Sequence, residues 1–275
     1  RLTEYKYPFE VKTHEFQSQG QTLQMAYMFL KGKTDKPVVT LLHGKNFNGA
    51  YWEGTARYLN SLGFSVLMPD QIGFGKSSKT LDYQYSFAAF AHNTKGLMQK
   101  LGIEKSIIMG HSMGGMLASR FALLYPEVTQ KLILLNPIGL ENYLEYVNYK
   151  DVAFFHSIEK KKTAAGVIAY QTKNYYDGKW TPEYEALTHF LIGQIQGPDK
   201  DLIAQNNALT YDMIFTQPVI TEFQNIKVPV VLILGTRDRT GPGRGWKRDG
   251  VTRELGRYDR LGSEVLSRLP SARLI

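Results

Sequence analysis

A serine flanked by glycines, Ser112 in the segment GHSMGG, has the surroundings expected of a nucleophile. A serine hydroxyl attacks a carbonyl carbon only when a neighbouring base takes its proton. The residues before Ser112, SIIMG, predict a buried strand, and the residues after it, MGGMLASRFALLY, predict a helix. Glycines at positions 110 and 114 permit a sharp turn between strand and helix. We therefore predict that Ser112 is exposed at the end of a strand as a catalytic nucleophile.

Attack by a serine on a carbonyl group creates a negatively charged oxygen, which needs N–H donors nearby. The start of the predicted helix supplies the backbone N–H of Met113 as a first donor. The segment LLHGKNFNG, residues 41–49, follows another predicted strand, and its glycines allow close approach of the backbone. We predict that the backbone N–H of Lys45 is the second donor of this oxyanion hole, with Asn46 as the alternative.

Elements that could position these residues alternate along the chain, since short apolar runs are followed by helical patterns. The predicted strands are 24–30, 37–44, 63–70, 105–110, 131–137 and 228–235. The predicted helices between them are 50–63, 85–102 and 113–127. This alternation is typical of the α/β class and predicts a mainly parallel, doubly wound sheet with helices on both faces.

The alternation stops between residues 137 and 228, where about ninety residues separate two strands that a crossover joins with far fewer. We interpret 138–227 as an inserted helical cap between two core segments, 1–137 and 228–275.

Within this cap, the segment WTPEYEALTHFLIGQI, residues 180–195, predicts one helix that begins at the N-cap Thr181. Its predicted buried stripe consists of Leu187, Phe190, Leu191 and Ile195.

The order of the motifs resembles that of the α/β-hydrolase superfamily with a helical cap, over nearly the whole core from residue 38 to 275. The matching motifs are a strand followed by HG, then PDQIGFGKSS, GHSMGG and LILGTRD. The resemblance implies that the acid of a catalytic triad follows the strand VPVVLILG, which assigns that role to Asp238. In a known variant the acid follows the preceding strand, but Asn136 stands there. The alternative reading of Asp238 is a residue that caps a turn.

The resemblance also implies that the catalytic histidine follows the last strand of the sheet. Every histidine of this chain precedes Asp238; they are His14, His43, His92, His111, His156 and His189. We expect His43 and His111 to have structural roles. We therefore expect the histidine to lie beyond Ile275. The alternatives are an enzyme without this base and recruitment of a cap histidine.

Taken together, these residues predict a serine hydrolase that cleaves an ester or related acyl bond through an acyl-enzyme on Ser112. No cofactor and no metal site are expected. The substrate is expected to be a small apolar or aromatic molecule, because the cap is rich in Tyr and Phe. Alternatives are a carbon–carbon bond hydrolase, a cofactor-free lyase, and a slow or non-catalytic ligand-binding relative that lacks the histidine.

Composition narrows the class further, because the chain contains no cysteine and therefore no disulfide or thiolate metal site. No apolar run is long enough to cross a bilayer, so integral membrane association is not expected.

The net charge is +8, and we interpret the basic segment 239–260, around Arg244 and Trp246, as a solvated surface rather than a nucleic-acid site. Because residue 1 is not methionine, we expect a periplasmic or secreted protein, with the cytoplasm as the alternative.

Overall fold

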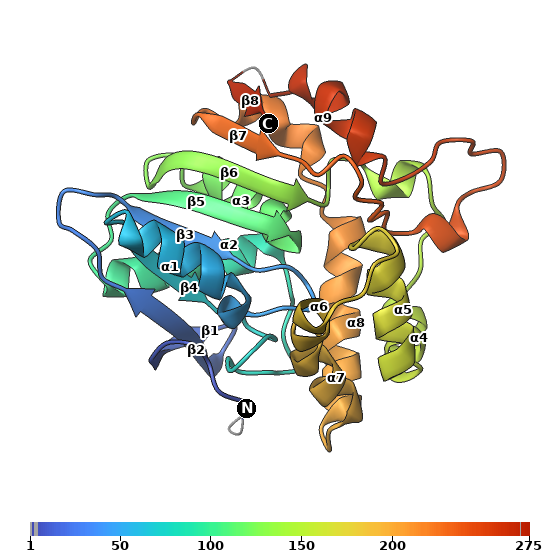
Figure 1. Ribbon diagram of the computed structural model, residues 1–275, viewed down its shortest axis with the longest axis horizontal. Coiled ribbons are helices and arrows are strands. Elements are labelled where there is room, and N and C mark those ends of the chain that lie inside the picture. Colours follow the sequence, from blue (N-terminus) through green and yellow to red (C-terminus); the bar gives the residue numbers. More distant parts are fainter. Residues whose placement is uncertain (1, 3–4, 270) are drawn as a thin grey trace.

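One mostly parallel sheet forms the centre of the molecule (Figure 1), a computed structural model that describes residues 2, 5–269 and 271–275. In this described part, the sheet has eight strands in the spatial order β1-β2-β4-β3-β5-β6-β7-β8. Strands β1 and β2 run antiparallel to their neighbours, and the other pairs are parallel. The strands are β1 Val11–Ser18, β2 Gln21–Leu30, β3 Val38–Leu42, β4 Ser65–Pro69, β5 Ser106–Ser112, β6 Thr129–Pro137, β7 Val230–Ile233 and β8 Ala272–Leu274.

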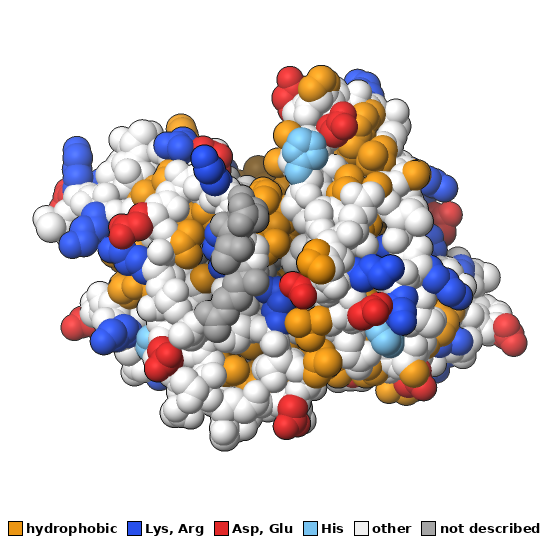
Figure 2. All heavy atoms as spheres, turned by 90° about the horizontal axis from the view of Figure 1, so that it is seen from below, with side chains coloured by type: hydrophobic (Ala, Val, Ile, Leu, Met, Phe, Trp, Pro, Cys, Tyr) orange, Lys and Arg blue, Asp and Glu red, His pale blue; other side chains and the backbone are white. Residues whose placement is uncertain are grey.

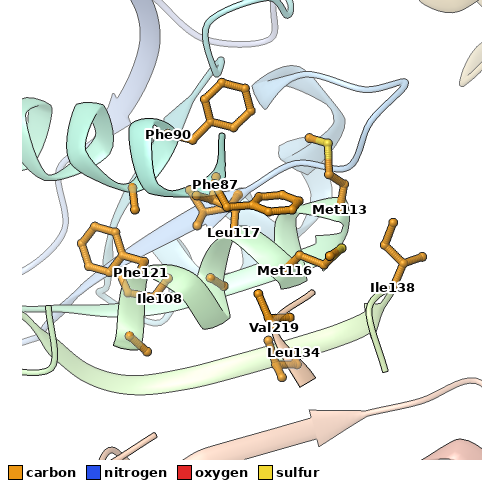
Figure 3. Packing of buried hydrophobic residues seen from close by; sticks show 14 of the residues in the cluster. Phe87, Phe90, Ile108, Met113, Met116, Leu117, Phe121, Leu134, Ile138 and Val219 are labelled. Atoms are coloured by element: carbon orange, nitrogen blue, oxygen red, sulfur yellow. The ribbon is translucent and has the colours of Figure 1, made fainter. Parts of the chain in front are cut away.

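Helices cover both faces of this sheet, as the alternation of side chains along β3 demonstrates. Val39 and Leu41 of β3 belong to a cluster with residues of the α1 side, whereas Leu42 belongs to the larger cluster under α2 and α3. Figure 3 shows part of the larger cluster, in which Phe121 of α3 lies close to the sheet. The core helices are α1 Glu53–Ser61, α2 Phe87–Lys100, α3 Met113–Leu124 and α9 Tyr258–Leu266. The predicted doubly wound α/β fold is therefore confirmed.

A group of helices between β6 and β7 in the sequence lies beyond the ends to which the central strands point (Figure 1). These helices are α4 Val152–Lys160, α5 Ala164–Asn174, α6 Pro182–Ala186, α7 His189–Gln196 and α8 Lys200–Thr216. Four short 3-10 helices are also present in the described residues: η1 Gly49–Trp52, η2 Tyr143–Glu145, η3 Ile220–Asn225 and η4 Arg244–Trp246. Helices α4 to α8 are called the cap below.

The prediction of a single helix over 180–195 was wrong, because the chain turns between α6 and α7. The hydroxyl of Thr188 donates a hydrogen bond to the carbonyl of Glu185, at 2.7 Å, and so satisfies a group that a continuous helix would use. Leu187, expected on the buried stripe, is consequently 41% exposed, whereas Phe190 and Leu191 are buried as predicted. No helix in the described part of the chain is long and apolar enough to span a bilayer.

Candidate active site

Ser112 ends strand β5 and immediately precedes helix α3, with φ of 56° and ψ of −122°. A positive φ is strained for a residue other than glycine, and such strain is typical of functional turns. The neighbouring glycines leave no room for a side chain. A Cβ at Gly110 would lie 2.0 Å from the carbonyl oxygen of Gly114, and a Cβ at Gly114 would lie 2.1 Å from that of Leu42. The sharp strand-to-helix turn predicted around Ser112 is present.

The loop after β3, residues 43–48, is called the oxyanion loop because it carries the predicted donor Lys45. It passes directly against the serine, since a Cβ at Gly44 would lie only 3.0 Å from the Cβ of Ser112. Lys45 follows Gly44, while Met113 begins helix α3. Met113 directly follows Ser112 in the chain, and Lys45 directly follows Gly44, which packs against Ser112. The role of both residues in binding an oxyanion stays a prediction.

His43 supports the oxyanion loop, and both of its ring nitrogens make hydrogen bonds to the backbone. Its Nδ1 donates a hydrogen bond to the carbonyl of Gly44 at 2.9 Å, and its Nε2 accepts one from the backbone N–H of Gln71 at 3.1 Å. Burial lowers the pKa of the His43 imidazole, which favours this neutral form. Because both ring nitrogens are used, His43 has the structural role that the sequence predicted.

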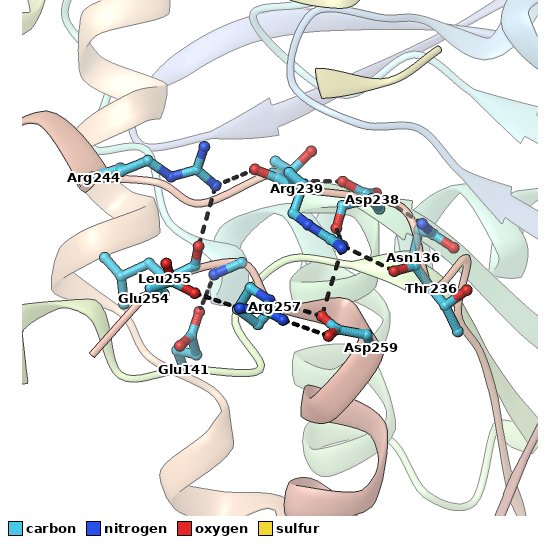
Figure 4. A network of polar contacts seen from close by, with 12 residues as sticks. Asn136, Glu141, Thr236, Asp238, Arg239, Arg244, Glu254, Leu255, Arg257 and Asp259 are labelled. Atoms are coloured by element: carbon cyan, nitrogen blue, oxygen red, sulfur yellow. Dashed lines mark hydrogen bonds and ion pairs between the residues drawn. The ribbon is translucent and has the colours of Figure 1, made fainter. Parts of the chain in front are cut away.

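Asp238, the predicted acid, lies in the loop after β7 with both carboxylate oxygens held (Figure 4). The side-chain amide of Asn136 donates to Oδ2 at 2.7 Å, and the backbone N–H of Thr240 donates to Oδ1 at 2.7 Å. The other end of the Asn136 amide, Oδ1, accepts from the backbone N–H of Gly235 at 2.9 Å. The carboxylate is therefore fixed in orientation, as a residue that orients an imidazole requires.

Sequence reasoning missed the role of Asn136, which it treated only as a position without an acid. The residue is the last but one of β6 and has φ of 38°, a conformation that asparagine tolerates better than most side chains. Because β6 and β7 are adjacent parallel strands, the position of Asn136 at the end of β6 was the signal that could have placed it beside Asp238.

A cavity of about 640 Å³ lies between the sheet edge and the cap, and both Ser112 and Asp238 contribute to its wall. The cap contributes aromatic side chains, with Tyr176 and Tyr184 stacked at 3.8 Å between ring centroids. The described residues that line it are Phe47, Tyr51, His111, Ser112, Asn136, Tyr175, Tyr176, Asp177, Lys179, Tyr184, Leu234, Gly235, Thr236, Arg237, Asp238 and Thr240. In the described part of the chain, no group of three or more His, Asp or Glu side chains could hold a metal ion.

His111 is the histidine among the described lining residues, but its surroundings do not suit a general base. Its ring packs between Phe47, Tyr51 and Trp52, with centroid distances of 6.0, 6.5 and 6.3 Å. Burial lowers its pKa to about 4, although the charge of Asp238 acts in the opposite direction. A base is most effective when its pKa lies near the working pH, so His111 is a poor candidate.

Strand β8 shows where a histidine after the last strand would emerge. It runs parallel to β7, and the carbonyl of Ile275 accepts a hydrogen bond from the backbone N–H of Leu234 at 3.0 Å. The carboxyl end of β8 therefore lies at the same sheet edge as the loop that carries Asp238. A residue carried beyond this strand would leave the sheet beside the acid.

Several side chains of the basic segment 239–260, which was predicted to be a solvated surface, make ion pairs or pack against other residues. Arg253 donates from Nε to Glu141 and from Nη2 to Glu264, at 2.8 and 2.7 Å, and Arg257 pairs with Asp259 (Figure 4). The Trp246 ring packs against aromatic residues of the cap. The face seen in Figure 2 likewise carries basic side chains interspersed with acidic ones.

The mostly parallel sheet carries a serine on a strained turn, a glycine-containing loop against that serine and an aspartate after β7. These features are those of the α/β-hydrolase architecture. The sequence model described as the alpha/beta hydrolase fold matches residues 37–159. The chain is also similar to the crystal structure of a probable hydrolytic enzyme from Pseudomonas aeruginosa, with 40% sequence identity and a TM-score of 0.97. The alignment covers 100% of this chain and 89% of the Pseudomonas chain. The chain belongs to the α/β hydrolase family.

Two curated relatives have more specific names. One, from Comamonas testosteroni, is a 2-hydroxy-6-oxononadienedioate/2-hydroxy-6-oxononatrienedioate hydrolase and is 40% identical over 109 residues. The other, from Burkholderia cepacia, is a 2-hydroxy-6-oxo-6-phenylhexa-2,4-dienoate hydrolase and is 39% identical over 105 residues. The matched segments cover 38% of both chains in the first case and 37% of both in the second. The match thus spans little more than a third of these relatives.

Proposed function

We propose that this protein is a serine hydrolase in which Ser112 attacks a carbonyl group bound in the cavity under the cap. The observation that carries this proposal is the positive φ of Ser112 on a turn that opens into the cavity, with Gly44 packed against it. The backbone N–H groups of Met113 and Lys45 would stabilise the oxyanion. Asp238 would orient a histidine that the family resemblance places after the last strand.

The preferred substrate class is a ketone whose carbon–carbon bond is cleaved by water, and this choice differs from the ester favoured by sequence reasoning. Its support is the names of the curated relatives, which are hydrolases of 2-hydroxy-6-oxo-dienoates. Addition to the ketone carbon forms a tetrahedral oxyanion. Breaking the adjacent carbon–carbon bond then releases a carbon fragment that takes up a proton, while the acyl fragment leaves as a carboxylic acid after water enters.

Ester hydrolysis is the second candidate, because the same oxyanion loop and serine serve both reactions. Attack by Ser112 would expel the alcohol and leave an acyl-enzyme, which water then hydrolyses. The tyrosines of the cavity wall, which include Tyr51, Tyr175 and Tyr184, support an aromatic acyl group in either case.

A direct comparison of two substrates separates these candidates. The protein is assayed with 2-hydroxy-6-oxo-6-phenylhexa-2,4-dienoate and with p-nitrophenyl butyrate, each alongside the Ser112→Ala variant. We expect turnover of the dienoate to exceed that of the ester, and Ser112→Ala to reduce it by about 10³-fold or more. Faster ester turnover would make the protein an esterase.

Equal rates for the parent and Ser112→Ala would refute the serine mechanism altogether. Binding of the dienoate without turnover by either protein would favour the ligand-binding alternative. Equilibrium dialysis with the same compound measures that binding.

A further inference from the structure

The side chain of Lys45 leaves the oxyanion loop and is buried beneath the cap, where it is 6% exposed. Its ammonium Nζ lies 3.9 Å from Oε1 of Glu159 on α4 and 4.9 Å from the ring centroid of Tyr211 on α8. Nζ has no hydrogen-bond partner among the described residues. A buried ammonium is costly unless a charge compensates it, so the contact with Glu159 is the main electrostatic support of Lys45.

Glu159 is itself held firmly by other residues of the cap. Lys162, just after α4, donates to its carboxylate at 2.7 Å, and the side-chain amide of Asn207 on α8 donates at 3.2 Å. Although burial raises the pKa of Glu159, the charges of Lys45 and Lys162 outweigh it, and the pKa lies below its usual value. The carboxylate of Glu159 is therefore charged and fixed in position, so that it can bind the ammonium of Lys45 to the cap.

This ion pair lies outside the wall of the cavity, because neither Lys45 nor Glu159 is among its lining residues. The Nζ atom is also closed to solvent. The side chains of Lys45 and Glu159 are therefore not placed to contact a substrate in the cavity. The pair instead joins two parts of the fold that both border the cavity, the cap and the oxyanion loop.

We propose that Glu159 is a positioning residue that, through the side chain of Lys45, holds the oxyanion loop in place against Ser112. The backbone of Lys45 and its side chain then have separate tasks: the N–H is the proposed oxyanion donor, and the ammonium connects the loop to Glu159 of α4. This inference rests on the proposed function for its catalytic consequence, but the mechanical link is independent of it.

The expected consequence is large because oxyanion donors act only at the right distance. A displacement of about 1 Å at a reacting centre can reduce turnover by about 10²-fold. A Cβ at Gly44 would lie only 3.0 Å from the Cβ of Ser112, so the loop has little room to move toward the serine. Loss of the anchor on Glu159 therefore weakens the oxyanion hole.

Amide hydrogen exchange of the oxyanion loop tests the link without any substrate. Exchange in residues 43–48 is measured by mass spectrometry for the parent, Glu159→Gln and Lys45→Met. We expect both variants to exchange about 10-fold faster in this segment, because local opening becomes easier when an anchor is lost. Lys45→Arg, which keeps the charge, should restore slow exchange.

The matched control is Lys162→Met, which also removes a cation from Glu159 but leaves the contact between Lys45 and Glu159 in place. It should change exchange in α4 and not in 43–48. Unchanged loop exchange in Glu159→Gln, or an equal effect of Lys162→Met on the loop, would overturn the proposal, whether or not the protein is a hydrolase.

Kinetics on whichever of the two substrates the parent turns over then tests the catalytic consequence. We expect Glu159→Gln to lower kcat by about 10- to 100-fold with KM nearly unchanged, since the oxyanion forms only in the transition state. The double variant Glu159→Gln/Lys45→Met should be little worse than either single one. A raised KM with unchanged kcat would contradict the positioning role. A parent inactive on both substrates would count against the proposed function alone, because the exchange result decides the link.

Discussion

Asn136 shows how a single amide can serve two neighbours at the end of a strand. Its Nδ2 holds the carboxylate of Asp238 and its Oδ1 holds the backbone N–H of Gly235. An acid at this position would repel Asp238, whereas an amide donates to it. The site therefore uses β6 to orient the acid carried after β7.

Replacing Asn136 by alanine should impair both orientation and stability. We expect Asn136→Ala to lower kcat by about 10-fold, because Asp238 keeps only its bond from Thr240. The free energy of unfolding should fall by about 1–3 kcal/mol, the cost of leaving a partly buried polar group unpaired. Steady-state kinetics and urea unfolding measure the two effects. An unchanged kcat would mean that Asn136 supports the loop without orienting the acid.

At this scale, the sequence predicts what is encoded locally. The turn at Ser112 could be predicted because Gly110 and Gly114 lie within two residues of it and have no room for a Cβ. The partnership of Lys45 with Glu159 could not, since 114 positions separate them and no local pattern links a loop lysine to a cap helix. The base was predicted from resemblance alone and stays a prediction.

At the scale of elements, ion pairs help to hold the loop after Asp238 in place, in addition to apolar packing. Glu141 is 5% exposed, and its carboxylate accepts hydrogen bonds from Arg253 and from the backbone N–H of Gly256. Arg257, by contrast, pairs with Glu254 and Asp259 in a more exposed setting. Removal of Arg253 therefore leaves the buried carboxylate of Glu141 without its cation, whereas removal of Arg257 leaves more exposed carboxylates.

Removal of the two arginines should therefore have unequal effects on stability. We expect Arg253→Met to lower the free energy of unfolding by about 2–3 kcal/mol, because Glu141 is left buried without its cation. Arg257→Met should cost less than about 1 kcal/mol, as exposed ion pairs do. Urea unfolding of both variants gives the comparison. Equal losses would show that the burial of Glu141 does not control the stability of this loop.

Pattern reasoning succeeded for elements with a clear apolar signature and failed where that signature is absent or interrupted. Strands β3 to β7 were found because each is a run of apolar residues in the core. Strand β1 was missed, because VKTHEFQS is largely polar and its residues are all at least partly exposed. The break between α6 and α7 was missed because Thr188 competes for a backbone carbonyl through its side chain.

For the molecule as a whole, the cavity forms where two layers of the chain meet, the sheet edge and the cap. The sheet edge contributes Ser112 and Asp238, while the cap contributes tyrosines that face them across about 640 Å³. The curated relatives match little more than a third of the chain. A motif in one of the two layers therefore does not by itself encode the cavity that both of them line.

The buried lysine between these layers gives the whole molecule a predictable dependence on pH. Burial lowers the pKa of Lys45 to about 7, with Lys162 acting in the same direction and Glu159 in the opposite one. Burial also raises the pKa of the nearby Tyr211, which stays neutral, so Lys45 is the group that changes charge here. In the unfolded chain its pKa returns to the ordinary value of 10.5.

Between about pH 7 and 10.5 the unfolded state therefore binds more protons at Lys45 than the folded state does, and stability from this group rises with pH. Below pH 7 both states carry the proton and the contribution is constant. We expect the unfolding free energy of the parent, measured by urea titration from pH 6 to 10, to rise relative to that of Lys45→Met. Lys45→Arg stays charged in both states throughout, so its curve should run parallel to that of Lys45→Met. Parallel curves for all three proteins would mean that Lys45 keeps its proton in the folded state, and the cap would then hold a permanent charge on the oxyanion loop.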